Sequence, residues 1–114
     1  MDTANNLSRY RQIIEEALTA VASIPHAYGD IHDQTIFERQ TDNYLVITKG
    51  WQKGRRVYHC LVHIEIIEGK VWIHHDGVEY GIATDLEQAG IPKEDIVLGF
   101  HPPEVRPFTE YAAA

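Results

Sequence analysis

Seven histidines are the residues of this chain that first suggest chemistry, because imidazole nitrogens are common ligands of transition metals. His59 and His63 fall on one side of a predicted strand, ~13 Å apart by the rise per residue, which is too far for both to bind one ion directly. His74 or His75, in the next predicted strand, can lie opposite one of them. Structural metal sites usually have four close ligands, and nothing in the sequence places a cysteine or an acid beside these histidines. We therefore predict no metal ligands and no cofactor.

Glu65, Glu68 and Lys70 straddle a predicted turn, and metal-dependent nucleases use acids and a lysine at such a spacing. Charges of this kind are also ordinary at a solvated hairpin turn. The single cysteine, Cys60, falls in an apolar strand, where burial makes a thiol inert. The sequence has no GxSxG, P-loop, GxGxxG or HExxH motif. We therefore predict no catalytic residue and a protein that is not an enzyme. A metal-dependent nuclease or DNA-processing enzyme is kept as an alternative.

Basic and aromatic residues gather in one short stretch, a combination that can bind phosphates or single-stranded nucleic acid. They are Lys49, Trp51, Lys53, Arg55, Arg56 and Tyr58. The whole chain, however, has ten Lys and Arg against seventeen Asp and Glu, a net charge of −7, which repels a phosphate backbone. Contact with nucleic acid is therefore expected to be indirect or weak, and a direct DNA-binding adaptor is a second alternative.

Aromatic residues are more numerous than a core of this size can bury, and exposed aromatic residues favour interfaces. Several of them follow Gly99, in a stretch whose glycine and prolines exclude regular structure. We predict partner or nucleic-acid contacts at both places, at Trp51, Lys53, Arg55, Arg56, Phe100, His101, Arg106, Phe108 and Tyr111.

The elements that must position these residues begin with a helix over about 7–24. Apolar residues recur there at helical spacing, and Pro25 ends the pattern. Asn6 or Ser8 is expected to cap the helix. Its single apolar stripe is expected to lie on a sheet.

Four stretches have the composition of strands: 31–39, which is polar enough for a sheet edge, 44–51, 55–67 and 70–76. Gln52-Lys53-Gly54 forms a short loop before the third strand, and Glu68-Gly69 forms the turn after it. That strand is expected to turn one apolar row toward the helix, comprising Tyr58, Cys60, Val62, Ile64 and Ile66. A short helix over 82–89 and another around 91–96 follow.

The predicted fold class is α+β, with an antiparallel β-meander of about four to five strands packed against a long N-terminal helix, and short C-terminal helices. With 114 residues and 44% hydrophobic content, the chain is expected to form a single domain over 1–114. It has one cysteine, no signal-peptide pattern and no membrane-length apolar run, so we expect a cytoplasmic protein. The exposed edges of a meander also allow a homo-oligomer.

Six segments of the sequence resemble the XisI family, the fdxN element excision controlling factor proteins of cyanobacteria. They are 10–14 (YRQII), 29–31 (GDI), 50–51 (GW), 55–58 (RRVY), 69–73 (GKVWI) and 91–106 (IPKEDIVLGFHPPEVR). The similarity extends from about Leu7 to Ala113, and none of the matching segments is catalytic.

The resemblance implies a controlling factor for programmed excision of a DNA element during heterocyst differentiation, in which a separate site-specific recombinase cuts and joins the strands. It also implies a XisH-like protein partner and, through it, a recombinase complex. An acidic domain without a catalytic constellation agrees with a regulator of a DNA-acting enzyme.

Overall fold

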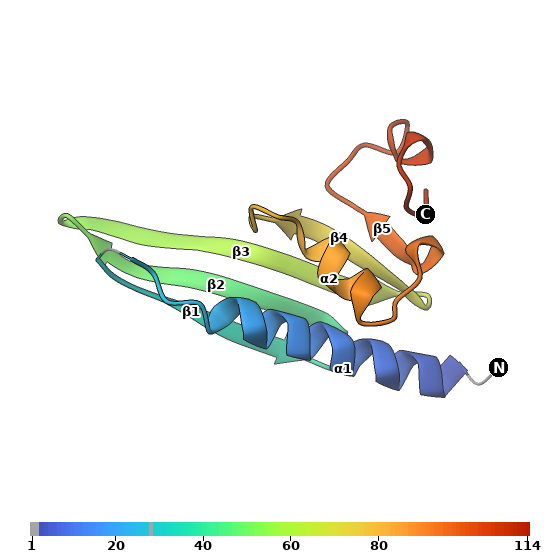
Figure 1. Cartoon of the computed structure of the whole chain (residues 1–114), viewed down its shortest axis with the longest axis horizontal. Coiled ribbons are helices and arrows are strands. Elements are labelled where there is room, and N and C mark those ends of the chain that lie inside the picture. Colours follow the sequence, from blue (N-terminus) through green and yellow to red (C-terminus); the bar gives the residue numbers. More distant parts are fainter. Residues whose placement is uncertain (1–2, 28) are drawn as a thin grey trace.

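A computed structural model describes residues 3–27 and 29–114, with the backbone alone for residues 3–5. One long helix precedes a sheet whose strands lie in chain order, β1-β2-β3-β4-β5, and a short helix precedes the last strand (Figure 1). The elements are α1 (Thr3–Ala22), β1 (Asp30–Glu38), β2 (Asn43–Gln52), β3 (Arg55–Ile67), β4 (Lys70–Asp76), α2 (Ile82–Gln88) and β5 (Ile96–Leu98). The predicted α+β class is confirmed.

The strands β1 to β4 form the predicted antiparallel meander, with β1 at an edge. The prediction of a purely antiparallel sheet is wrong for β5, which pairs with β4 in parallel. The chain leaves β4, crosses through α2 and returns in the same direction, as parallel neighbours require. The second predicted short helix is also wrong, because residues 93–95 form only one 3₁₀ turn before β5 begins.

The helix α1 begins four residues earlier than expected, at Thr3 rather than Leu7. Asn6 and Ser8 therefore lie within the helix, and the prediction that either one caps it is wrong. Its end agrees with the sequence, because Ala22 is its last residue and Pro25 follows shortly after. None of the described helices has the length and hydropathy needed to cross a membrane.

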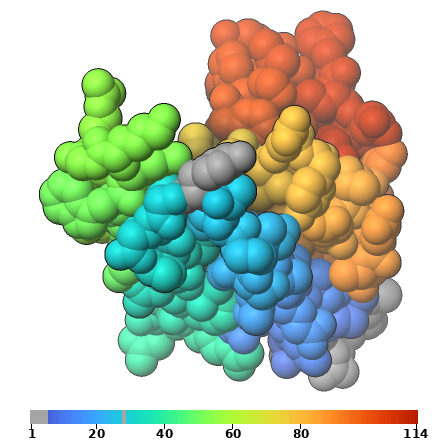
Figure 2. Space-filling model, turned by 60° about the vertical axis from the view of Figure 1, so that its left-hand side comes forward, coloured from blue at the N-terminus to red at the C-terminus, as the bar shows by residue number. Residues whose placement is uncertain are grey.

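The molecule is elongated, 51 × 31 × 24 Å along its principal axes. The β2–β3 hairpin extends past the end of α1 (Figure 1) and stands out as a separate lobe in the space-filling view (Figure 2). The C-terminal residues form another projection, which extends sideways from the half of the molecule away from this hairpin tip (Figure 1). The two projections therefore offer two distinct surfaces.

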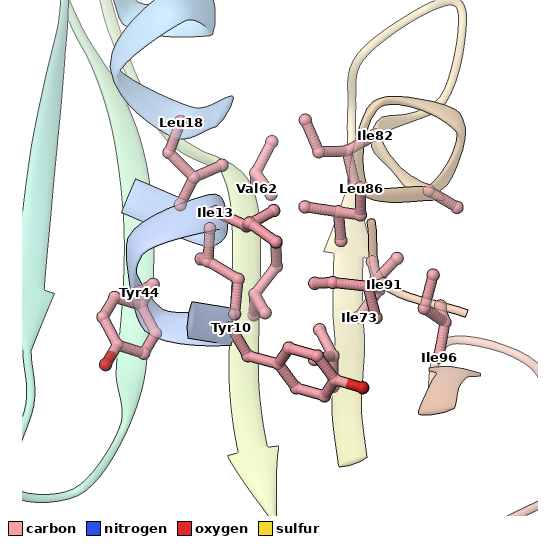
Figure 3. Packing of buried hydrophobic residues seen from close by; sticks show 14 of the residues in the cluster. Tyr10, Ile13, Leu18, Tyr44, Val62, Ile73, Ile82, Leu86, Ile91 and Ile96 are labelled. Atoms are coloured by element: carbon pink, nitrogen blue, oxygen red, sulfur yellow. The ribbon is translucent and has the colours of Figure 1, made fainter. Parts of the chain in front are cut away.

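The core lies between one face of the sheet and the two helices. Leu18 of α1, Val62 of β3 and Leu86 of α2 belong to one buried cluster (Figure 3). Both helices cover this one face (Figure 1). The opposite face of the sheet, called here the open face, is covered by neither α1 nor α2, and Arg106 of the C-terminal residues lies over Trp72 at its β4 side.

A β-bulge in β3 corrects the predicted apolar row. Val46 of β2 pairs with Val62 and the next residue, Ile47, pairs with Cys60, which leaves Leu61 as the extra residue. The extra residue reverses the alternation of faces, so Tyr58 and Cys60 lie on the open face instead of under α1. Only Val62, Ile64 and Ile66 of the predicted row are buried in the core.

Candidate partner interface

The tip of the β2–β3 hairpin combines an arginine with two exposed aromatic rings. Trp51 pairs with Arg56 across the strands, and the next pair on the same face is Lys49 with Tyr58. The guanidinium carbon of Arg56 lies 5.6 Å from the ring centre of Trp51 and 5.7 Å from that of Tyr58. The aromatic residues are 53% and 65% exposed. The arginine thus holds two rings in place without burying them.

The turn of this hairpin holds its basic side chains away from the body. Lys53 and Gly54 both have positive φ, 50° and 76°, as expected for a type I′ two-residue turn. Lys53, Arg55 and Arg56 are all exposed. Four of the predicted contact residues, Trp51 and these three, are therefore brought together at one end of the sheet.

The C-terminal arm, residues 99–114, contains the other predicted contact residues. Arg106 holds it on the sheet, with its guanidinium carbon 4.9 Å from the ring centre of Trp72 and its Nε donating to the His101 carbonyl at 3.0 Å. The Ala112 backbone N–H donates to the Ile96 carbonyl at 2.9 Å. The arm is therefore anchored at several points along its length.

Tyr111 anchors the arm to α2. Its hydroxyl donates to a carboxylate oxygen of Glu87 at 2.7 Å. Burial, reinforced by this hydrogen bond, raises the pKa of Tyr111 to about 12. Lys93 pairs with Glu110 and lies over the Tyr111 ring. The side chains of Arg106 and Tyr111 are therefore engaged within the chain.

Two phenylalanines of the arm face solvent. Phe108 is 89% exposed and Phe100 is 46% exposed, the latter with its ring against His101. An anchored segment that displays apolar rings loses little conformational entropy on binding. The arm projects to one side of the sheet, far from the hairpin tip (Figure 1), so the predicted contact residues form two surfaces and not one.

The open face is a surface that the sequence analysis missed. Strand register places Ile36, Leu45, Ile47 and Cys60 on it, in two neighbouring rows that run across β1, β2 and β3. Ile36 is 43% exposed and the others are half-buried. The signal was present in β2, where apolar residues occupy consecutive positions from Tyr44 to Ile47 and both faces of the strand are therefore apolar.

The histidines are distributed differently from the prediction. His59 pairs with Thr48 on the helix-covered face, whereas His63 pairs with Leu45 on the open face, so they do not share a side. The rings of His63 and His74 lie 5.0 Å apart, centre to centre. Burial, with a smaller effect of His74, lowers the pKa of His63.

These two histidines are engaged in hydrogen bonds with neighbours on the open face. His63 Nε2 lies 2.8 Å from Asn43 Oδ1, and His74 Nε2 lies 2.9 Å from Glu65 Oε1. Across residues 3–27 and 29–114, no group of three or more His, Cys, Asp or Glu side chains is arranged to hold a metal ion.

The residues that suggested a nuclease likewise have other interactions or positions in the structure. Glu65 is paired with His74 on the open face, and the Lys70 ammonium donates to the Ala114 carbonyl. Glu68 occupies the β3–β4 turn at φ 50°. Burial raises the pKa of the Cys60 thiol, which favours its unreactive form.

The comparisons with known proteins that gave a match agree on one family. A sequence model of the family described as XisI protein matches residues 1–113. A XisI-like protein from Anabaena variabilis ATCC 29413 is similar in structure with a TM-score of 0.87 and 33% identity, over 95% of this chain and 99% of that one. The fdxN element excision controlling factor XisI from the same organism is similar with a TM-score of 0.75 and 36% identity, over 96% and 99%. The search of proteins with curated functions found no significant match.

Proposed function

The chain belongs to the XisI family, and from this premise we propose that it is a non-catalytic accessory factor that controls the excision of a DNA element through a protein partner. The observation that carries the proposal is the 36% identity, over 96% of the chain, to a structure named as an fdxN element excision controlling factor. A XisH-like protein is the proposed partner, with a recombinase complex acting downstream.

The C-terminal arm is the surface we assign to this partner. Binding energy at protein interfaces is concentrated in a few aromatic and arginine anchors. Phe108 and Phe100 are exposed, while Arg106 and Tyr111 fix the arm beneath them. A partner with an apolar pocket can bury both rings without first ordering the segment.

We expect the Phe108→Ala variant to bind the XisH-like protein about 30-fold more weakly, because removing a buried aromatic anchor costs about 2 kcal/mol. Co-expression of the two chains, followed by co-purification and calorimetric titration, measures the loss. Tyr80→Ala is the matched control, since Tyr80 is also a largely exposed aromatic residue but lies outside the arm. Failure of the unmodified pair to form a complex would rule out the proposal. An equal loss for both variants would rule out the arm as the surface.

A direct DNA-binding adaptor is a second candidate, favoured by the projecting hairpin tip with its exposed arginines, lysine and tryptophan (Figure 2). Aromatic rings flanked by cations can stack on bases and contact phosphates. A local basic lobe can do this even on an acidic chain, provided that binding depends strongly on salt.

If the tip binds DNA, the double variant Lys53→Glu, Arg55→Glu is expected to weaken binding at least about 10-fold and to reduce the salt slope by about 2. Fluorescence anisotropy with single-stranded and duplex probes across a salt series measures both. The control is Arg39→Glu, a charge reversal beyond the opposite end of β1 from the tip. Binding that is insensitive to salt, or equally weakened by the control, would exclude this candidate.

A further inference from the structure

The open face has a composition that is unusual for a sheet surface in contact with water. An antiparallel sheet with one solvated face normally alternates apolar residues inward and polar residues outward. Here two apolar pairs lie at the centre of the open face, Ile36 beside Leu45 and Ile47 beside Cys60, with His63 and Gln34 completing their rows. Both helices lie on the other face (Figure 1). Nothing among the described residues covers this apolar centre.

The charges on the open face are separated along its length. Arg56 lies near the hairpin tip, Lys49 reaches from the next row to donate to Gln34 opposite Ile47, and Glu65 lies toward the opposite end of β3, beside Asn43. Asn43 and Trp51 mark these ends on β2, ~26 Å apart by the rise per residue. Ile47 is midway between them. On β3 the face therefore carries a positive charge near the tip and a negative charge at the far end, while β1 has an acid at each end, Asp30 opposite Trp51 and Glu38 opposite Asn43.

From this pattern we propose that a second copy of the chain covers the open face, with the strands of the two copies running in opposite directions. A two-fold axis across the strands near Ile47 places the apolar middle of one copy on that of the other. The same operation places Arg56 over the partner's Glu65, and the partner's Arg56 over Glu65. Two sheets pack face to face about 10 Å apart, which long side chains can bridge.

The alternative way for the chain to pair with itself is along the outer edge of β1. Antiparallel pairing centred on Gln34 would place Asp30 directly opposite the partner's Glu38, twice in the dimer. Like charges directly opposite one another destabilise a strand pair. In the face-to-face arrangement the same operation also brings Asp30 over the partner's Glu38, but across the roughly 10 Å between the sheets and at the solvated rim, where repulsion is weaker than between directly paired strand residues. The charge pattern therefore favours the face over the edge.

Purified protein without any partner tests this proposal, so its outcome is independent of the proposed function. Sedimentation equilibrium across a concentration series reaching about 100 μM is expected to show a mass near twice 13.0 kDa. The Ile47→Arg variant is expected to sediment as a monomer while keeping the circular dichroism spectrum of the folded chain. Thr19→Arg, which adds the same charge on the exposed side of α1, should remain dimeric.

A charge exchange tests the orientation. Arg56→Glu and Glu65→Arg are each expected to weaken the dimer at least about 10-fold, and the double variant is expected to recover most of that loss. A double variant no tighter than the singles would overturn the antiparallel arrangement. A monomeric unmodified chain, or a dimer that Ile47→Arg leaves intact, would overturn the proposal that a second copy covers this face.

Discussion

Replacing Gly50 by alanine is expected to lower the free energy of unfolding by about 3 kcal/mol or more, because the new methyl group would collide with the backbone of the neighbouring strand. Gly50 pairs with Ile31 of β1. A Cβ atom there would lie 1.9 Å from the carbonyl oxygen of Asp30 and 2.8 Å from the Cα atom of Ile31. These are backbone atoms, so relief requires β1 to move away from β2. Urea denaturation followed by tryptophan fluorescence measures the loss.

Gly54→Ala is the matched control, since Gly54 lies in the turn that follows the same strand. Its φ is +76°, and a Cβ atom there would have no neighbour within 4 Å. The free energy of unfolding of Gly54→Ala is therefore expected to fall only by the strain of alanine in a left-handed backbone conformation, about 1–2 kcal/mol. If Gly50→Ala costs no more than this control, the close approach of β1 to Gly50 is not a constraint on the fold. A larger cost is the expected result, and it includes the strain of alanine at the φ of +151° that Gly50 adopts as well as the collision with β1.

The boundaries of β3 could be read from the sequence because they depend on local chemistry. Residues 55–67 are rich in β-branched and apolar residues, and each end is marked by a dipeptide ending in glycine. Lys53-Gly54 and Glu68-Gly69 take positive φ at both residues, which is the conformation such turns require. Where the backbone conformation is decided by two adjacent residues, a single sequence is sufficient to predict it.

The faces of β3 could not be read in the same way, because the bulge at Leu61 has no local signature. Strict alternation predicted Tyr58 and Cys60 in the core, and one extra residue was enough to move both to the open face. The parallel pairing of β5 was also missed, since it depends on how α2 crosses the sheet. The composition of the hairpin tip was predictable, but the separation of tip and arm was not, because it depends on the whole sheet.

Asp42 is a further residue whose role the sequence concealed, as it lies in a polar connection between two strands. Its Oδ1 accepts from Arg11 Nε at 2.7 Å and from the Tyr44 hydroxyl at 2.8 Å, and its Oδ2 accepts from the second arginine nitrogen at 3.0 Å. Its carbonyl accepts from the Ile66 N–H at 3.0 Å. One turn residue therefore ties α1, β2 and β3 together, and the residues that supply its partners are far apart in the sequence.

The Asp42→Ala variant is expected to lose about 2 kcal/mol of unfolding free energy at pH 7, a value reduced for the partial exposure of Arg11. The loss arises because the buried Tyr44 hydroxyl keeps no acceptor in the core and the guanidinium loses a two-point partner. Asp42→Asn should lose less, because asparagine tolerates the φ of 56° and retains one oxygen acceptor. Glu15→Gln is the control, because it weakens a pair whose arginine, Arg39, is 61% exposed, and it should cost less than either.

The pH dependence of stability distinguishes the loss of the Asp42 carboxylate charge from a loss of packing. Only the charge effect changes with pH. Hydrogen bonds from Arg11, then from Tyr44, hold the pKa of Asp42 below its ordinary value of 3.8 in the folded state. A carboxyl group whose pKa is lowered by folding stabilises the protein above its unfolded pKa, and that stability is lost as the pH falls through the folded value. The stability difference between the unmodified chain and Asp42→Asn should therefore be constant near neutral pH and shrink below about pH 4. A difference that is unchanged at pH 3 would mean that the carboxylate charge does not contribute, and that the turn is held by its backbone and by the Tyr44 hydroxyl alone.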